Sequence, residues 1–118
     1  MKLRDIIRII DGQVLTQGVN LDQDVEGVCA ADLMSDVLTY KVSNAILLTG
    51  LCNPQVVRTA EMADVAAIVI VRGKLPPRET IDLANAERIP LIASPYGMFE
   101  MSGRLFRAGL SSCDSCLS

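Results

Sequence analysis

The stretch that decides the fold is AILLTGLCNP, residues 45–54, in which a short apolar run ends in Thr49-Gly50 and Asn53-Pro54 follows. Asparagine before proline is typical of a helix start, because the asparagine side chain can cap free amides and proline fits the first helical position. The order therefore predicts a buried strand, a tight polar turn and then a helix.

The same order occurs twice more along the chain. Ala66–Val71 ends in Arg72-Gly73-Lys74, with a helix start at Pro76-Pro77, and Pro90–Ala93 ends in Ser94-Pro95-Tyr96. Strands that alternate with helices indicate a parallel sheet with covered faces. We therefore predict an α/β fold: a compact three-layer module with a mainly parallel sheet flanked by helices.

The segment before these units predicts a helix and two short strands. Apolar residues recur at helical spacing at Leu3, Ile6, Ile7 and Ile10. Asp11-Gly12 ends this helix, and we expect Gly12 to take the left-handed conformation just past its end. Strands are expected at Gln13–Thr16 and Val25–Ala30.

Residues 32–38 predict a further short helix. Its apolar face would carry Leu33, Met34, Val37 and Leu38. Asp32 is expected to be the N-cap. Asp36 follows one turn later, so the two carboxylates could form an acidic site, but a capping Asp32 and a solvated Asp36 are the favoured interpretation.

The last predicted helix, Gly97–Ala108, has two apolar stripes. One face carries Met98, Met101, Leu105 and Ala108. Phe99 and Phe106 lie on a neighbouring stripe. Either the helix is buried on two sides or one stripe meets a partner chain. We favour the partner chain, and therefore a homodimer.

Length and composition restrict the class of protein. A chain of 118 residues with 50% hydrophobic residues is one domain with a substantial core, which we place at residues 1–110, followed by a tail at 111–118. The net charge of −3 argues against a nucleic-acid partner. The charged amino terminus is unlike a secretory signal, and no apolar run approaches the ~20 residues that cross a bilayer. We expect a cytoplasmic protein.

Ligand crevices in parallel sheets lie outside the carboxyl ends of the strands. We call the segments that follow the three strands, Thr49-Gly50, Arg72-Gly73-Lys74 and Ser94-Pro95-Tyr96, the first, second and third exits. The candidate ligand-binding residues lie in or next to them and are Thr49, Gly50, Asn53, Arg72, Gly73, Lys74, Ser94 and Tyr96. Cations, a hydroxyl, a phenol and free helix amides would suit a phosphate or a nucleotide. Neither GxxxxGK[ST] nor GxGxxG is present, so ordinary turn chemistry is the alternative interpretation.

Catalysis and metal binding are the other functions to consider. The chain has no His, and no serine or cysteine has an identifiable activating base, so we do not expect an enzyme. Cys113 and Cys116 have the spacing of a metal knuckle, and two such tails in a dimer could supply four ligands to a metal ion or an iron–sulfur cluster. The alternative is a terminus with two exposed thiols.

From about Met1 to Leu110 the chain resembles the DRTGG domain. The phrases that carry the resemblance are Val25–Val28, Asp32–Leu38, Thr49-Gly50, Arg72-Gly73-Lys74, Ile89-Pro90-Leu91 and Ser94–Phe99. The resemblance implies an accessory α/β module similar to the amino-terminal domain of HPr kinase/phosphorylase. Such modules also occur in some phosphate acetyltransferases and between the CBS domains of regulatory pyrophosphatases, often at a dimer interface.

The chain departs from the family pattern at two exits. The Asp-Arg pair that follows the first glycine in the family is Leu51-Cys52 here, and the family's Thr-Gly-Gly is Arg72-Gly73-Lys74. The leading prediction is a non-catalytic, homodimeric regulatory or assembly module that binds a small anionic or nucleotide ligand, with a further protein as a possible partner. The alternative is a metal or iron–sulfur accessory protein using the terminal cysteines, which the resemblance links to iron-only hydrogenase systems.

Overall fold

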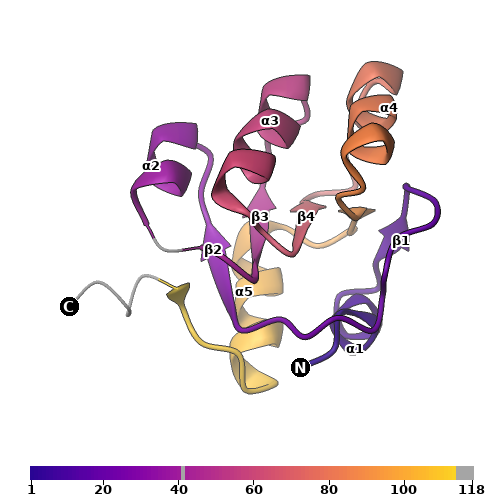
Figure 1. Ribbon diagram of the computed structural model, residues 1–118. Coiled ribbons are helices and arrows are strands. Elements are labelled where there is room, and N and C mark those ends of the chain that lie inside the picture. Colours follow the sequence, from indigo (N-terminus) through magenta and orange to yellow (C-terminus); the bar gives the residue numbers. More distant parts are fainter. Residues whose placement is uncertain (41, 114–118) are drawn as a thin grey trace.

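The computed structural model describes residues 1–40 and 42–113. The described residues form a five-stranded sheet in the order β1-β5-β4-β3-β2. The strands are β1 (Gln13–Val14), β2 (Gly27–Ala30), β3 (Ala45–Thr49), β4 (Ala67–Ile70) and β5 (Leu91–Ala93). Strands β2 to β5 are parallel, and β1 runs antiparallel to β5 at one edge. The predicted α/β fold with a mainly parallel sheet is confirmed (Figure 1).

Helices cover both faces of the sheet and complete the three layers. They are α1 (Leu3–Ile9), α2 (Met34–Thr39), α3 (Pro54–Ala63), α4 (Arg78–Glu87) and α5 (Met98–Arg107). Helices α2, α3 and α4 connect successive parallel strands and lie on one face, whereas α1 and α5 lie on the other (Figure 1). Within the described ranges, no helix has both the length and the apolar character needed to cross a membrane.

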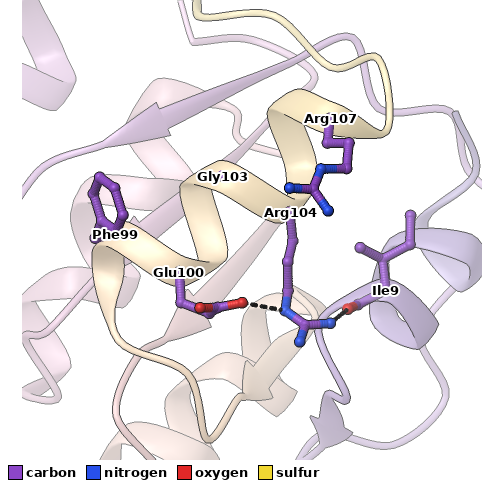
Figure 2. Close-up of a pocket in the computed structure, with 6 residues that line it drawn as sticks. All are labelled: Ile9, Phe99, Glu100, Gly103, Arg104 and Arg107. Atoms are coloured by element: carbon purple, nitrogen blue, oxygen red, sulfur yellow. Dashed lines mark hydrogen bonds and ion pairs between the residues drawn. The ribbon is translucent and has the colours of Figure 1, made fainter.

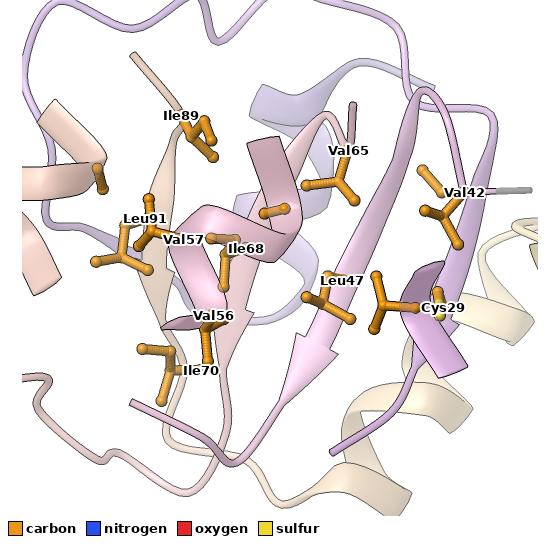
Figure 3. Packing of buried hydrophobic residues seen from close by; sticks show 14 of the residues in the cluster. Cys29, Val42, Leu47, Val56, Val57, Val65, Ile68, Ile70, Ile89 and Leu91 are labelled. Carbon is orange, nitrogen blue, oxygen red and sulfur yellow. The ribbon is translucent and has the colours of Figure 1, made fainter. Parts of the chain in front are cut away.

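The core is divided between the two faces because side chains alternate along each strand. Leu47 of β3 and Ile68 of β4 pack against Val57 of α3 (Figure 3). Ile46, one residue before Leu47, points the other way and packs in the cluster that contains Met101 of α5. All five side chains are fully buried. Both faces of the sheet are therefore apolar, which explains the nearly continuous hydrophobic runs of β3 and β4.

The exit from α1 differs from the sequence prediction. Gly12 was expected in the left-handed conformation, and this was wrong, because Asp11 takes it with φ of 50°. Gly12 is needed for space instead: a Cβ there would lie 2.7 Å from Cγ2 of Ile92 on β5. Strand β1 is also shorter than expected, although the Thr16 hydroxyl still accepts a hydrogen bond from the Leu91 amide at 3.2 Å.

Helix α2 begins later than expected, and Asp32 does not cap it. The N-cap position is taken by Leu33, which makes no side-chain capping bond and is 62% exposed. Of the predicted apolar face, Val37 is buried and Met34 is half-buried, whereas Leu38 is exposed. The carboxylate of Asp32 bonds to the end of β3 instead, where a backbone amide and a hydroxyl are both available as donors.

The segment after α5 lies along the outer edge of β2. The amide of Val28 donates to the carbonyl of Ser111 at 3.0 Å, and Val28 and Ser112 form a parallel bridge. Gly27 permits this approach, because a Cβ there would lie 3.2 Å from the Ser111 oxygen. Cys113 is buried in the core cluster beneath α2 and α3. Residues 111–113 therefore pack against the sheet.

Candidate functional site

The register of the sheet brings the three predicted exits together. Thr49 at the end of β3 pairs with Ile70 of β4, and Ile70 pairs with Ala93 of β5. The three parallel strands therefore end at the same level, and their exit loops lie side by side at the carboxyl edge. The structure thus brings Thr49-Gly50, Arg72-Gly73-Lys74 and Ser94-Pro95-Tyr96 to one edge.

Asp32 organises the first exit. Its Oδ1 accepts a hydrogen bond from Thr49 Oγ1 at 3.0 Å and another from the Gly50 amide at 2.8 Å. The Leu51 amide in turn donates to Thr49 Oγ1 at 3.2 Å. Thr49 is fully buried, so its hydroxyl shapes the loop from within. Asp32 was expected to cap a helix and not to lie in this site. The signal in the sequence that could have indicated its role is an aspartate just after the strand that neighbours a Thr-Gly exit.

Lys74 joins the first exit to the second. Its Nζ donates to the carbonyl oxygen of Gly50 at 3.1 Å, which holds the ammonium group between the ends of β3 and β4. An ammonium group has three donors, so the others remain available to a ligand. Among the described residues, no carboxylate lies within ion-pair distance of Lys74.

The backbone of the second exit is held in an uncommon conformation. Arg72 and Gly73 are both left-handed, with φ of 67° and 66°. Their amides donate to the carbonyl oxygens of Tyr96 and Ser94 at 2.8 and 2.7 Å. The Arg72 guanidinium lies over Gly97, with its Cζ 3.7 Å from the position of a Cβ there. The guanidinium therefore stands at the amino terminus of α5.

The side chains of the third exit are engaged within the fold. The buried hydroxyl of Ser94 donates to the carbonyl oxygen of Ile10 at 2.7 Å. The phenol of Tyr96 donates to the carboxylate of Asp11, and this bond is the main cause that raises the Tyr96 pKa above its ordinary value. The Arg104 guanidinium lies 4.1 Å from the centre of the Tyr96 ring. The side chains of Ser94 and Tyr96 therefore bond to residues just after α1. Their contribution to the exit is mainly their backbone carbonyl groups.

Asn53 occupies the expected position but makes no capping bond. It is the N-cap residue of α3, followed by Pro54 at the first helical position, and its side chain accepts no bond from the helix amides. It lines an open hollow of about 640 Å³ between α3 and α4, together with Glu79 and Asp82. Arg58 also lines the hollow, but two acids against one cation make it less suitable for an anion than the loop that carries two cations.

The predicted sulfur pair is only partly described. Cys113 is buried, and Cys116 lies outside the described residues. Within residues 1–40 and 42–113, no group of three or more His, Cys, Asp or Glu side chains is placed to hold a metal ion. A metal or iron–sulfur site at Cys113 and Cys116 therefore stays a prediction.

Comparison with known proteins identifies the family. The model of the DRTGG domain matches residues 5–108, which is most of the chain, and the chain belongs to this family. A similar solved structure is the crystal structure of the CBS and DRTGG domains of the regulatory region of Clostridium perfringens pyrophosphatase, complexed with its activator diadenosine tetraphosphate. The TM-score is 0.71 at 17% identity, over 88% of this chain and 45% of that chain.

At that identity the likeness establishes a shared fold. The chain spans less than half the length of the pyrophosphatase regulatory chain that it matches. Among curated proteins, no significant relative was found.

Proposed function

We propose that this chain is a non-catalytic regulatory module that binds a small anionic ligand or a nucleotide at the carboxyl edge of its sheet and acts as a homodimer. Membership of the DRTGG family supports the regulatory role, because the similar domain belongs to the regulatory region of a pyrophosphatase. The nucleotide activator bound in that structure supports the ligand class.

The observation that carries the ligand proposal is the pair of cations at the second exit. Arg72 and Lys74 are both exposed, and among the described residues neither has an acidic partner within ion-pair distance. Arg72 is directed to the amino terminus of α5, where free amides and the helix dipole already carry positive partial charge. A cation held at this end of a helix is complementary to a phosphate group.

Asp32 shapes this surface and is not proposed as a catalytic base. Its Oδ1 is occupied by two donors, Thr49 and Gly50, and the bonds position the loop whose carbonyl holds Lys74. The chain contains no His to act as a general base near neutral pH. We therefore propose binding without chemical conversion of the ligand.

Two exposed aromatic side chains support the dimeric part of the proposal. Phe99 is 92% exposed and Phe106 is 77% exposed, both on α5. A small domain that presents large apolar side chains on one helix is expected to cover them by association.

The ligand proposal is tested by titration calorimetry and thermal denaturation with inorganic phosphate, adenosine nucleotides and diadenosine tetraphosphate. Arg72→Gln and Lys74→Gln remove one charge each at similar side-chain length. We expect each variant to weaken binding by about tenfold or more, because charge-assisted hydrogen bonds are lost, and affinity to fall as salt is added.

Arg88→Gln is the matched control, because Arg88 is exposed at the end of α4, just before β5, and therefore lies at the opposite edge of the sheet from the exit loops. It should bind as the wild type does. The ligand proposal fails if none of these compounds raises the melting temperature, or if the two exit variants bind as tightly as the control.

A further inference from the structure

The outward face of α5 carries two large side chains with a glycine between them. Met101 and Leu105 are buried against the sheet, which fixes the direction of the opposite face. Phe99 and Phe106 lie toward that outward face, and Gly103 lies between them at its centre. A Cβ built at Gly103 meets no atom within 4 Å, so the space above the helix is open.

Charged side chains lie on the other side of Gly103. These side chains border an open hollow of about 490 Å³, which is lined by Ile9, Phe99, Glu100, Gly103, Arg104 and Arg107 (Figure 2). Glu100 Oε2 accepts a hydrogen bond from Arg104 Nε at 2.8 Å, and its other oxygen can still accept from a second donor. Among the described residues, no carboxylate lies within ion-pair distance of Arg107.

We propose that α5 packs antiparallel against α5 of a second copy of this chain, about a twofold axis that passes at Gly103. The inference rests on the dimeric part of the proposed function and specifies its surface. In this arrangement Phe99 packs on the partner subunit's Phe106, and Glu100 pairs with the partner subunit's Arg107. Along one helix, the midpoint between Phe99 and Phe106 and the midpoint between Glu100 and Arg107 lie on either side of Gly103, each within one residue of it.

Symmetry makes this single helix face complementary to itself. A twofold axis perpendicular to two antiparallel helices places the same edge of each helix on the same side of the interface. The aromatic edge of α5 therefore meets the aromatic edge of its partner, and the charged edge meets the charged edge. Opposite charges face each other because the two helices run in opposite directions, so that Glu100 of one copy lies opposite the partner subunit's Arg107. Gly103, at the centre, lets the two helix backbones approach closely.

The test measures the mass in solution over a range of concentrations by analytical ultracentrifugation. Gly103→Leu fills the space at the axis, and Phe106→Asp places a charge in the aromatic contact. We expect each to raise the dimer dissociation constant by about tenfold or more. Leu75→Asp is the matched control, because Leu75 is 75% exposed but lies outside α5, and it should leave the dissociation constant unchanged.

Charge reversal provides the second arm. Glu100→Arg and Arg107→Glu should each weaken the dimer, because like charges then face each other, and the double variant should restore the wild-type dissociation constant. Thermal denaturation of each variant checks that the fold is kept. Rescue by the double variant requires that the two positions face each other across the interface, whereas a purely structural role predicts the sum of the two losses.

The outcomes separate this inference from the proposal on which it rests. A dimer that is unaffected by the α5 variants overturns the α5 pairing and leaves a homodimer formed through another surface. A wild-type protein that stays monomeric at high micromolar concentration overturns both. Ligand binding at Arg72 and Lys74 is measured separately and does not depend on either result.

Discussion

Thr59 of α3 and Thr80 of α4 are buried to the same degree, each 1% exposed, but within the described part of the chain only the Thr80 hydroxyl has a hydrogen-bond partner. Thr80 Oγ1 donates to the carbonyl oxygen of Cys52 at 2.7 Å. Thr59 Oγ1 has no partner among the described residues. The two threonines therefore form a natural pair for measuring what a buried hydroxyl contributes to this fold.

Replacing each threonine by valine, which has the same shape, should change stability in opposite directions. Thr59→Val removes a hydroxyl that is buried without a bond and should raise the free energy of unfolding by about 1 kcal/mol. Thr80→Val leaves the Cys52 carbonyl without its donor and should lower it by about 1 kcal/mol or more. Urea denaturation with an unchanged m-value checks both. Equal effects of the same sign would contradict the assignment.

Asp32 should contribute to stability as well as to the shape of the exit. Asp32→Ala removes the acceptor of both the Thr49 hydroxyl and the Gly50 amide, so we expect a loss of about 1–2 kcal/mol. Asp32→Asn keeps an oxygen acceptor at this position and should recover part of the loss. If the alanine variant melts at the wild-type temperature, the two bonds do not hold the loop.

The Tyr96 phenol should titrate above its ordinary range. Its hydrogen bond to the Asp11 carboxylate favours the protonated form and raises its pKa. Because the folded-state pKa lies above the unfolded one, the stabilisation is complete below the unfolded pKa and is lost as pH rises through the folded pKa. Ultraviolet titration should show one tyrosine that ionises late, and Asp11→Asn should lower its pKa. A spectrum unchanged by Asp11→Asn would contradict this coupling.

Arg72 should show a conflict between stability and binding. Its left-handed backbone is unfavourable for a side chain with a Cβ, so Arg72→Gly should raise the free energy of unfolding by about 0.5–1 kcal/mol. The same substitution removes a cation from the proposed ligand site and should weaken anion binding. Arg72→Gln keeps the backbone strain, so it should weaken binding with no gain in stability. Unfolding and calorimetric titration of both variants separate the two effects.

The parallel strands could be predicted from the sequence because each is an apolar run bounded by turn residues. Ala45–Thr49 and Leu91–Ala93 lie where the apolar runs predicted them. Short edge elements were predicted less well, because β1 is held by its partner β5 and has little pattern of its own. The Phe99 stripe on α5 was visible from helical spacing, but whether a second copy covers it depends on contacts outside the chain.

The meeting of the three exits at one edge of the sheet could be predicted from the sequence, and the contacts that their side chains make could be predicted less well. The exits lie together because β3, β4 and β5 are neighbours in the sheet. This could be expected, because strands that are consecutive in the chain are usually neighbours. The role of Asp32 could not be predicted, because its partner Thr49 is 17 residues away and the pairing depends on the register of β2 and β3. Ser94 and Tyr96 were predicted to face a ligand, and their partners Ile10 and Asp11 come from the other end of the chain.

The bridge between Val28 and Ser112 has a consequence for solubility. An open strand edge offers unpaired amides and carbonyls to strands of other molecules, and is a common start of aggregation. Here the Val28 amide is already bonded to Ser111, so three residues protect the edge of β2. A chain cut after Leu110 would lose this protection together with the buried side chain of Cys113. Removing residues 111–113 should therefore raise the tendency of the domain to associate through the edge of β2.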